Sequence, residues 1–231
     1  IHDELPDLHI HGFTALEITE GAKRLNEPLE SYLKRAQEAG LKSLPGTAAE
    51  ILDDEIREIL CPDKISTEEW LEAHRVAHGV GLKSNVTMMF GSVENPIHWA
   101  KHLIATRSLQ KETGGFTEFV GLPFVHMASP IYLKKRARRG PTFRENLLLH
   151  AVARITYHGH IGNIQASWVK IGINGMSQML QAGVNDVGGT LNGENISRAA
   201  GAKHGQMITE DEFKKLCDSL GRELILRSTL Y

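Results

Sequence analysis

Residues 82–122, LKSNVTMMFGSVENPIHWAKHLIATRSLQKETGGFTEFVGL, decide the fold class. Two short apolar runs at Leu82–Met89 and Phe116–Leu122 have the length and composition of strands. Between them, Asn95-Pro96 can open a helix and Gly114-Gly115 can end it. A strand, a helix and a second strand at this spacing predict a βαβ unit with parallel strands.

The same alternation continues on both sides of this unit. Further strands are predicted at Leu8–Phe13, Leu41–Leu44, Ile161–Trp168 and Val184–Val187. Further helices are indicated by Pro28 and by capping boxes that begin at Ser66, Thr142 and Thr209. Regular βα alternation predicts a parallel sheet covered by helices, which is either doubly wound or a barrel.

The faces of the strands favour the barrel. None of the predicted strands is followed by the GxGxxG motif of a dinucleotide-binding fold. In the run 161–168, Asn163, Gln165 and Ser167 share one face, and apolar residues share the other. Asn85 and Thr87 oppose apolar neighbours in the same way. The sequence therefore predicts an α/β, TIM-like (β/α) barrel with a polar lumen. About six of its eight βα units would be present, as a single incomplete domain over residues 1–231.

The composition argues against several partner classes. The chain has 231 residues and a formal net charge of -2, so neither nucleic acid nor a membrane is expected as a partner. The basic run 134–139 is interpreted as a solvated loop, with an anion contact as the alternative. No apolar stretch approaches the roughly 20 residues needed to span a bilayer.

The cysteines and the first residues indicate in which cellular compartment the protein is expected. Cys61 and Cys217 are too few and too far apart for a disulfide framework or a zinc site, and they favour a reducing, cytoplasmic setting. Ile1–Glu4 has no features of a signal peptide and no initiator methionine. We therefore expect the chain to begin inside a longer protein.

Histidines supply the first site candidates. His9 and His11 lie on one face of a short predicted strand, where imidazoles can donate, accept or relay protons. The alternative is a pair of hydrogen-bonded core histidines. The pairs His74/His78 and His98/His102 have helical spacing that can bind metal, but their charged neighbours predict surface histidines.

Two predicted loops follow strands at the face where barrels form active sites. Glu50, after the second strand, can bind an ammonium group, and Arg57 can bind a carboxylate, as an amino acid requires. A helix-terminal charge with a surface arginine fits the spacing equally well. Gly188-Gly189, after the last strand, can bind phosphate through its backbone or form a tight turn.

Six strings of the sequence are specific. They are HIHGF at 9–13 with LEI at 16–18, PGTAAEILDD at 45–54, SNVTMMFG at 84–91, TGGFTEFVGLPFVHMAS at 113–129, IQASWVKIG at 164–172 and NDVGGTL at 185–191. In this order and spacing they resemble the radical SAM enzymes that make the deazaflavin chromophore, the FO synthases. The resemblance is closer to the tyrosine-using half, 5-amino-6-(D-ribitylamino)uracil–L-tyrosine 4-hydroxyphenyl transferase.

This resemblance implies a reaction and its cofactors. A 4Fe-4S cluster would cleave S-adenosyl-L-methionine to a radical that abstracts hydrogen from L-tyrosine. The 4-hydroxybenzyl fragment would then be transferred to the diaminouracil. The resemblance also implies the other half of FO synthase as a partner.

The resemblance also gives roles to residues of this chain. Glu50 and Arg57 would hold the amino-acid end of S-adenosyl-L-methionine or tyrosine, and His9 and His11 would handle protons or bind substrate. The residues expected to bind a ligand by hydrogen bonds are Asn85, Thr87, Gln165 and Ser167. Asp186 and Thr190 would lie at the rim.

Two departures leave alternatives open. The family's CxxxCxxC cluster motif is not found in the sequence, and Asp7 leads directly into the strand at Leu8, where the family has a helix of about four turns. An inactive fragment, or a barrel piece completed by a partner, is therefore one alternative. Aminofutalosine synthase of menaquinone synthesis is another, although Leu122–Ser129 favours the deazaflavin enzyme. A metal-independent barrel that binds a phosphorylated ligand is the third.

Overall fold

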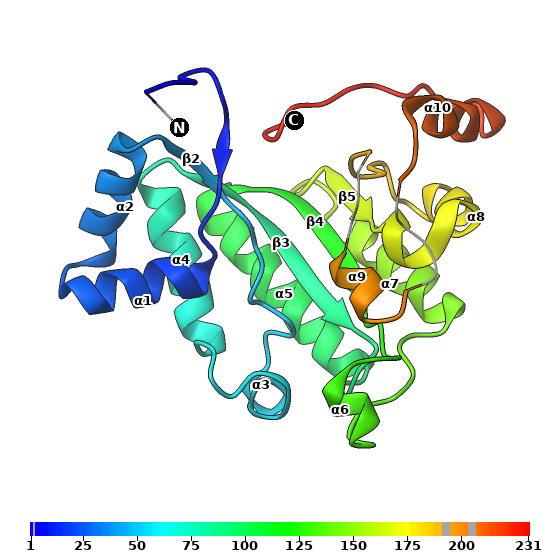
Figure 1. The fold of residues 1–231 in the computed structure, drawn as a ribbon, viewed down its shortest axis with the longest axis horizontal. Helices are drawn as coiled ribbons and strands as arrows, with labels where there is room; N and C mark the ends of the chain where they lie inside the picture. Colours follow the sequence, from blue (N-terminus) through cyan, green and yellow to red (C-terminus); the bar gives the residue numbers. More distant parts are fainter. Residues whose placement is uncertain (2, 191–194, 203–206) are drawn as a thin grey trace.

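A five-stranded, all-parallel sheet forms the centre of the chain, in the order β1-β2-β3-β4-β5 (Figure 1). The computed structural model describes residues 1, 3–190, 195–202 and 207–231. The strands are β1 Ile10–His11, β2 Leu41–Leu44, β3 Lys83–Phe90, β4 Phe116–Pro123 and β5 Asn163–Ala166. Because neighbours in the sheet are also neighbours in sequence, the order is that of consecutive barrel strands, which confirms the predicted fold class.

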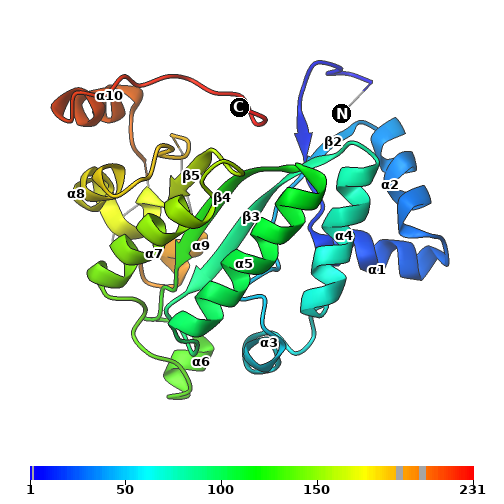
Figure 2. The same cartoon turned by 180° about the vertical axis from the view of Figure 1, so that it is seen from behind.

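Ten helices lie in the described part of the chain. They are α1 Ala15–Leu25, α2 Leu29–Glu38, α3 Asp54–Leu60, α4 Thr67–Gly79, α5 Pro96–Thr113, α6 Pro130–Leu133, α7 Phe143–Thr156, α8 Trp168–Gln181, α9 Ile196–Ala199 and α10 Glu210–Ser219. Seen from behind, α4, α5 and α7 cover one face of the sheet (Figure 2). None of the helices searched among the described residues is long and apolar enough to cross a membrane.

The predicted helix starts are confirmed by their caps. Ser66, Thr142 and Thr209 each form a capping box, and Pro28 is the N-cap of α2. The αL C-cap of α5 is Gly114.

The last predicted strand was wrong. Of Val184–Val187, only Asp186 pairs with the sheet, through a single bridge to Gln165. The side chain of Asn185 accepts from the backbone N–H of Ile164, and Asp186 Oδ1 accepts from the N–H of Gly188. These local bonds turn the chain away before a ladder can form. The described residues thus contain five strands where the sequence predicted six, and the first of them is shorter than Leu8–Phe13.

The hydrophobic core fills the space between the sheet and its helices. β3 places Val86, Met88 and Phe90 there, each fully buried, while Asn85 and Thr87 point to the opposite face. Tyr157, the C-cap of α7, packs against Phe119, completing the core layer. The opposite face of the sheet therefore carries the polar side chains, as the alternation predicted.

Two histidines predicted to lie on the surface are fully buried. His74 packs between Trp70 and Phe116, and His102 Nδ1 accepts from the backbone N–H of Leu52. His78 is partly buried and bonds to Thr113 and Ser84. The prediction failed because α4 and α5 press these faces against the sheet despite their charged neighbours.

Acid should unfold this protein through its buried histidines. Burial lowers the pKa of His78 to about 4 and of His102 to about 3. Between these values and about 6.5, the unfolded chain binds protons that the folded chain excludes, so stability falls as pH drops below about 6.5. Each histidine should lower the free energy of unfolding by about 2 kcal/mol between pH 7.5 and pH 5. Urea unfolding at the two pH values measures this.

A pair of variants identifies the source of the effect. His102→Asn keeps an acceptor for Leu52 and should remove part of the pH dependence. His158→Asn, at an exposed position, should not alter it. Equal stability of the parent chain at both pH values would contradict the assignment.

Candidate functional site

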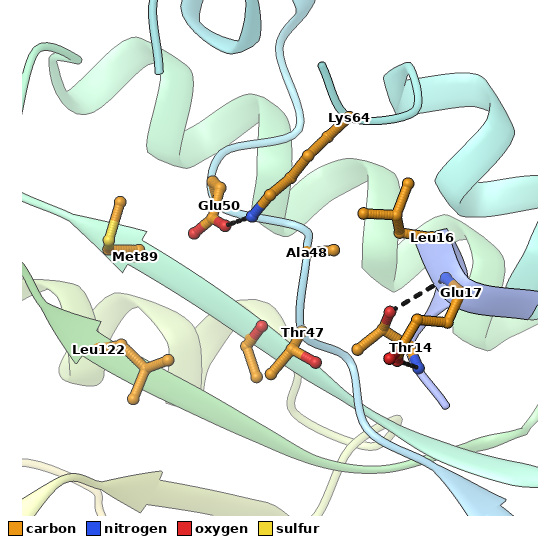
Figure 3. Close-up of a pocket in the computed structure, with 10 residues that line it drawn as sticks. Thr14, Leu16, Glu17, Thr47, Ala48, Glu50, Lys64, Met89 and Leu122 are labelled. Atoms are coloured by element: carbon orange, nitrogen blue, oxygen red, sulfur yellow. Dashed lines mark hydrogen bonds and ion pairs between the residues drawn. The ribbon is translucent and has the colours of Figure 1, made fainter. Parts of the chain in front are cut away.

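A pocket of about 390 Å³ lies beside the carboxyl ends of β2, β3 and β4 (Figure 3). This is the end of a parallel barrel where active sites form. Its lining residues are Thr14, Leu16, Glu17, Thr47, Ala48, Glu50, Lys64, Thr87, Met89 and Leu122. The volume lies in the usual range for small-molecule sites, and two of the predicted site residues, Glu50 and Thr87, are part of the wall.

Opposite charges meet at the pocket wall. Lys64 Nζ donates directly to Glu50 Oε1, and both side chains are only partly exposed. The backbone of Glu50 has φ of 43°, a left-handed conformation that only the surrounding loop can maintain. From the sequence, a cation was predicted near Glu50, and Arg57 was named as that cation. Lys64 was not named, because a helix and a turn separate Lys64 from Glu50 along the chain.

Arg57 contacts backbone carbonyls beside the loop that carries Glu50. Its guanidinium is buried and donates to the backbone carbonyls of Ala48, Ala49 and Ile65. It is therefore neither a surface arginine nor a partner of Glu50. Because each of these carbonyls needs a donor when buried, Arg57 holds the loop that carries Glu50 in place.

The other side of this loop is fixed by β3. Gly46 donates its N–H to Asn85 Oδ1 and accepts at its carbonyl from Thr87 Oγ1, which lies 2.6 Å away. A Cβ on Gly46 would lie 2.0 Å from the backbone oxygen of Asn85. Only glycine allows this approach, so the two polar residues of β3 both position the loop.

Replacing Gly46 by alanine should therefore displace the loop. We expect Gly46→Ala to lower the free energy of unfolding by about 1–3 kcal/mol, since the contact is with backbone that cannot rotate away. Urea unfolding measures the loss. Gly162→Ala is the control because a Cβ there meets nothing within 4 Å. Equal stability of the two variants would show that the loop adapts.

His9 and His11 meet on one hydroxyl group. His9 Nε2 and His11 Nδ1 each lie 2.7 Å from Ser43 Oγ, so they share a face as predicted. Burial lowers the pKa of both imidazoles, with Lys42 adding to the effect at His9 and His9 adding to it at His11. Both rings are therefore favoured in the neutral form that can accept a proton.

A second polar cluster occupies the amino-terminal half of the same sheet face. The buried carboxylate of Glu118 accepts from Asn85 Nδ2 at 3.1 Å and from Gln165 Nε2 at 2.9 Å. The hydroxyl of Tyr231 lies within hydrogen-bond distance of both Glu118 and Asp186 and has one proton to donate to them, and Arg227 pairs with both acids. Sequence reasoning missed Glu118, Arg227 and Tyr231. A lone acid within the apolar strand FTEFVGL was the available signal, because a buried charge needs partners.

The loop after Asp186 favours the turn over the phosphate site. The N–H of Gly188 is donated to Asp186 Oδ1 at 2.6 Å, and the carbonyl of Gly189 accepts from Trp168 Nε1 at 3.0 Å. A buried carboxylate beside the loop would also repel an anion. Ser167 caps α8 without a side-chain bond, and Thr190 is exposed.

The cysteines do not fit an iron–sulfur cluster. Cys61 and Cys217 are both free and buried, and burial raises the pKa of each thiol. A 4Fe-4S cluster needs more thiolates than these two residues provide. Within the part of the chain that the structure describes, no set of residues matches the ligands of such a cluster.

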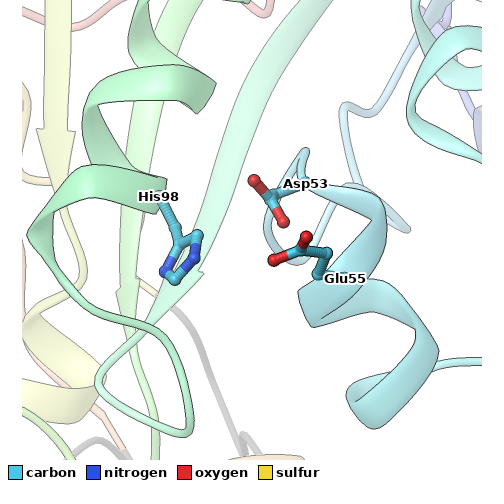
Figure 4. A group of neighbouring side chains, drawn as sticks. All are labelled: Asp53, Glu55 and His98. Carbon is cyan, nitrogen blue, oxygen red and sulfur yellow. The ribbon is translucent and has the colours of Figure 1, made fainter.

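One group of side chains has the spacing of a metal site but lies apart from the pocket (Figure 4). The ligand atoms of Asp53, Glu55 and His98 all lie within 4.8 Å of one another. Lys101 already donates to Asp53 at 2.6 Å, and His98 Nδ1 accepts from the N–H of Asn95 in the cap of α5. A nitrogen acting as acceptor leaves the proton on Nε2, so His98 is committed to the helix cap in this arrangement.

Comparison with known proteins shows the family to which this chain is related. The model of the CofH/MqnC C-terminal region matches residues 113–231, which include Glu118, Gln165, Asp186 and Tyr231. The chain belongs to this family. Its membership confirms the resemblance that the sequence strings indicated.

Several relatives of the family match along nearly the whole chain. FO synthase of Nocardia farcinica is 52% identical over 98% of this chain, and FO synthase of Streptomyces coelicolor is 46% identical over all of it. A protein of Methanothermobacter thermautotrophicus named 5-amino-6-(D-ribitylamino)uracil–L-tyrosine 4-hydroxyphenyl transferase is 46% identical over all of it. The chain spans 26–27% of those two synthases and 63% of the transferase.

A solved structure supports the fold independently. Methylornithine synthase has a TM-score of 0.60 to this chain with 17% sequence identity, covering 92% of this chain and 63% of the other. At this identity the likeness concerns the fold alone.

Proposed function

We propose that the protein containing this chain is the tyrosine-using transferase of deazaflavin (FO) synthesis. It would join the 4-hydroxybenzyl fragment of L-tyrosine to 5-amino-6-(D-ribitylamino)uracil, in a cytoplasmic setting. The observation that carries the proposal is 46% identity to the Methanothermobacter transferase over the full length of this chain. The described residues would form most of a single barrel domain, and the remaining length of the relatives would supply the rest.

The pocket suits the amino-acid end of a substrate. An α-amino acid presents an ammonium and a carboxylate, and the wall presents the Glu50 carboxylate beside the Lys64 ammonium. An incoming amino acid would exchange the internal ion pair for two pairs of its own without leaving a charge unpaired. L-tyrosine and S-adenosyl-L-methionine both carry this group. Arg57 would act by holding the loop, not by touching the ligand.

Binding of L-tyrosine tests this role of the pocket. Glu50→Gln and Lys64→Met should each weaken the affinity for L-tyrosine by roughly tenfold, because each removes one charge-assisted partner. Isothermal titration calorimetry measures the affinity. Glu30→Gln is the matched control, since Glu30 and Lys34 form an exposed ion pair on α2. Equal affinities in all three variants would remove the amino-acid site from this pocket.

The polar face of the sheet would serve the second substrate. Gln165 of β5 and Ser167, the N-cap of α8, would bind this substrate, and the neutral imidazoles of His9 and His11 would accept or relay a proton. Asn85 and Thr87 would contribute indirectly, since both are committed to Gly46. Asp186 would belong to the lumen floor and Thr190 to its rim.

The cofactors of the proposed reaction concern the whole protein. S-adenosyl-L-methionine with a 4Fe-4S cluster would supply the radical that starts the chemistry. Because Cys61 and Cys217 do not fit the cluster, no step of the reaction is assigned to them. The companion half of FO synthase remains the proposed protein partner, as the greater length of the synthases allows.

The transcript that encodes this chain gives the direct test. We expect the reading frame upstream of the Ile1 codon to encode a CxxxCxxC segment. The protein made from that frame, with reconstituted cluster and reductant, should couple L-tyrosine to the diaminouracil, as measured by mass spectrometry. Replacing its motif cysteines by serine is the control and should abolish the product. A complete, iron-loaded protein that makes no such product would contradict the proposal.

A further inference from the structure

The orientation of two amide side chains follows from one carboxylate. A carboxylate oxygen only accepts hydrogen bonds, so the groups turned toward Glu118 must be donors. Asn85 and Gln165 therefore both direct their NH₂ groups at it. For Asn85 the assignment is confirmed from the other side, because its oxygen accepts from the N–H of Gly46.

Gln165 differs from Asn85 in the contacts of its amide oxygen. With its NH₂ group held by Glu118, its carbonyl oxygen Oε1 is directed away from the carboxylate. No hydrogen bond to this oxygen exists among the residues that the structure describes, and the side chain is only partly buried. The network therefore presents one acceptor, of fixed direction, on the polar face of the sheet at β5.

The position of Glu118 depends in turn on the end of the chain. Residues 222–231, after α10, have no helix or strand and run back toward the sheet (Figure 1). Within this segment, Arg227 bonds to Asp186, and the hydroxyl of Tyr231 contacts both Glu118 and Asp186. The guanidinium of Arg227 lies 4.3 Å from the centre of the Tyr231 ring. Burial and the Glu118 carboxylate raise the pKa of the Tyr231 phenol well above its ordinary value, so the hydroxyl stays a donor.

Without these two residues the acids would lack compensation. Glu118 and Asp186 are 7% and 8% exposed, and both lie within hydrogen-bond distance of the same phenol, which has one proton to donate. Two neighbouring carboxylates repel each other and are costly to bury unpaired. Without the tail, the Glu118 carboxylate would lose the donors that hold it and could rotate, and the amide of Gln165 would lose its fixed acceptor.

We propose that Arg227 and Tyr231 are positioning residues for the lumen: through Glu118 they fix Gln165 so that Oε1 accepts an N–H group of the bound ligand. The ligand class is a heterocycle or amine with an N–H donor. If the proposed function is correct, this ligand is the diaminouracil, whose ring and amino groups carry such donors. The positioning itself rests only on the contacts in this structure.

Nuclear magnetic resonance of the chain tests the positioning without any ligand. Tyr231→Phe keeps the ring and removes only the donor, so exchange of the Gln165 side-chain NH₂ protons with solvent should become about fivefold faster or more. Tyr32→Phe is the matched control, because Arg35 likewise lies over the ring of Tyr32, far from the sheet acids. Gln37, bonded to Val80, gives an internal reference signal. Unchanged exchange at Gln165 in Tyr231→Phe would overturn the positioning.

Ligand affinity then tests what the positioned oxygen does. The affinity of the chain for 5-amino-6-(D-ribitylamino)uracil should fall about fivefold or more in Tyr231→Phe, while the affinity for L-tyrosine stays within about twofold. Arg227→Lys keeps the positive charge but loses the forked guanidinium. Its affinity for the diaminouracil should lie between the affinities of the parent chain and of Arg227→Ala. Unchanged uracil affinity with altered Gln165 exchange would overturn the recognition role.

The two experiments separate this inference from the proposed function. If the parent chain binds no diaminouracil, the ligand named here is wrong and the proposed substrate loses support. The exchange measurement still decides the positioning in that case. Thermal unfolding of each variant shows whether it is folded, and Tyr231→Phe changes one hydroxyl only.

Discussion

The buried carboxylate of Glu118 is the constraint on which the polar face of this sheet depends. A charge in this position is stable only with several donors, and it obtains them from β3, from β5 and from the last residue of the chain. Segments more than a hundred residues apart in sequence are thereby tied to one point. The requirement to satisfy one acid explains why an extended tail without helix or strand returns to the sheet.

The carboxyl end of the sheet is organised by a second set of bonds, from side chains to backbone. Arg57 donates to carbonyls of the loop 48–51, and Thr87 of β3 donates to the carbonyl of Gly46, just before this loop. A loop held on both sides can keep Glu50 at positive φ with its carboxylate beside Lys64. The charges at the pocket are therefore positioned by Arg57, which does not line the pocket, and by Thr87 of β3, which does.

Local patterns predicted most of the scaffold and little of the site. Capping boxes, Gly114 and the apolar runs determine elements through neighbours in sequence, so β2, β3, β4 and the longer helices were predicted closely. Lys64 and Tyr231 reach their partners only through tertiary structure, which no spacing rule contains. The error at His74 and His102 has the same origin, because charged neighbours on a helix do not show which face packs on the sheet. Arg57 was selected for its charge, yet its contacts show that backbone carbonyls were its partners.

Asn85 joins the Glu118 cluster to the loop that borders the pocket. Its amide nitrogen donates to Glu118, and its oxygen accepts from Gly46 in that loop. Because one planar amide makes both bonds, a rotation that breaks one also breaks the other. The tail that holds Glu118 is thus connected through a single residue of β3 to the loop that carries Glu50. A displacement at either end is therefore transmitted to the other through the amide of Asn85.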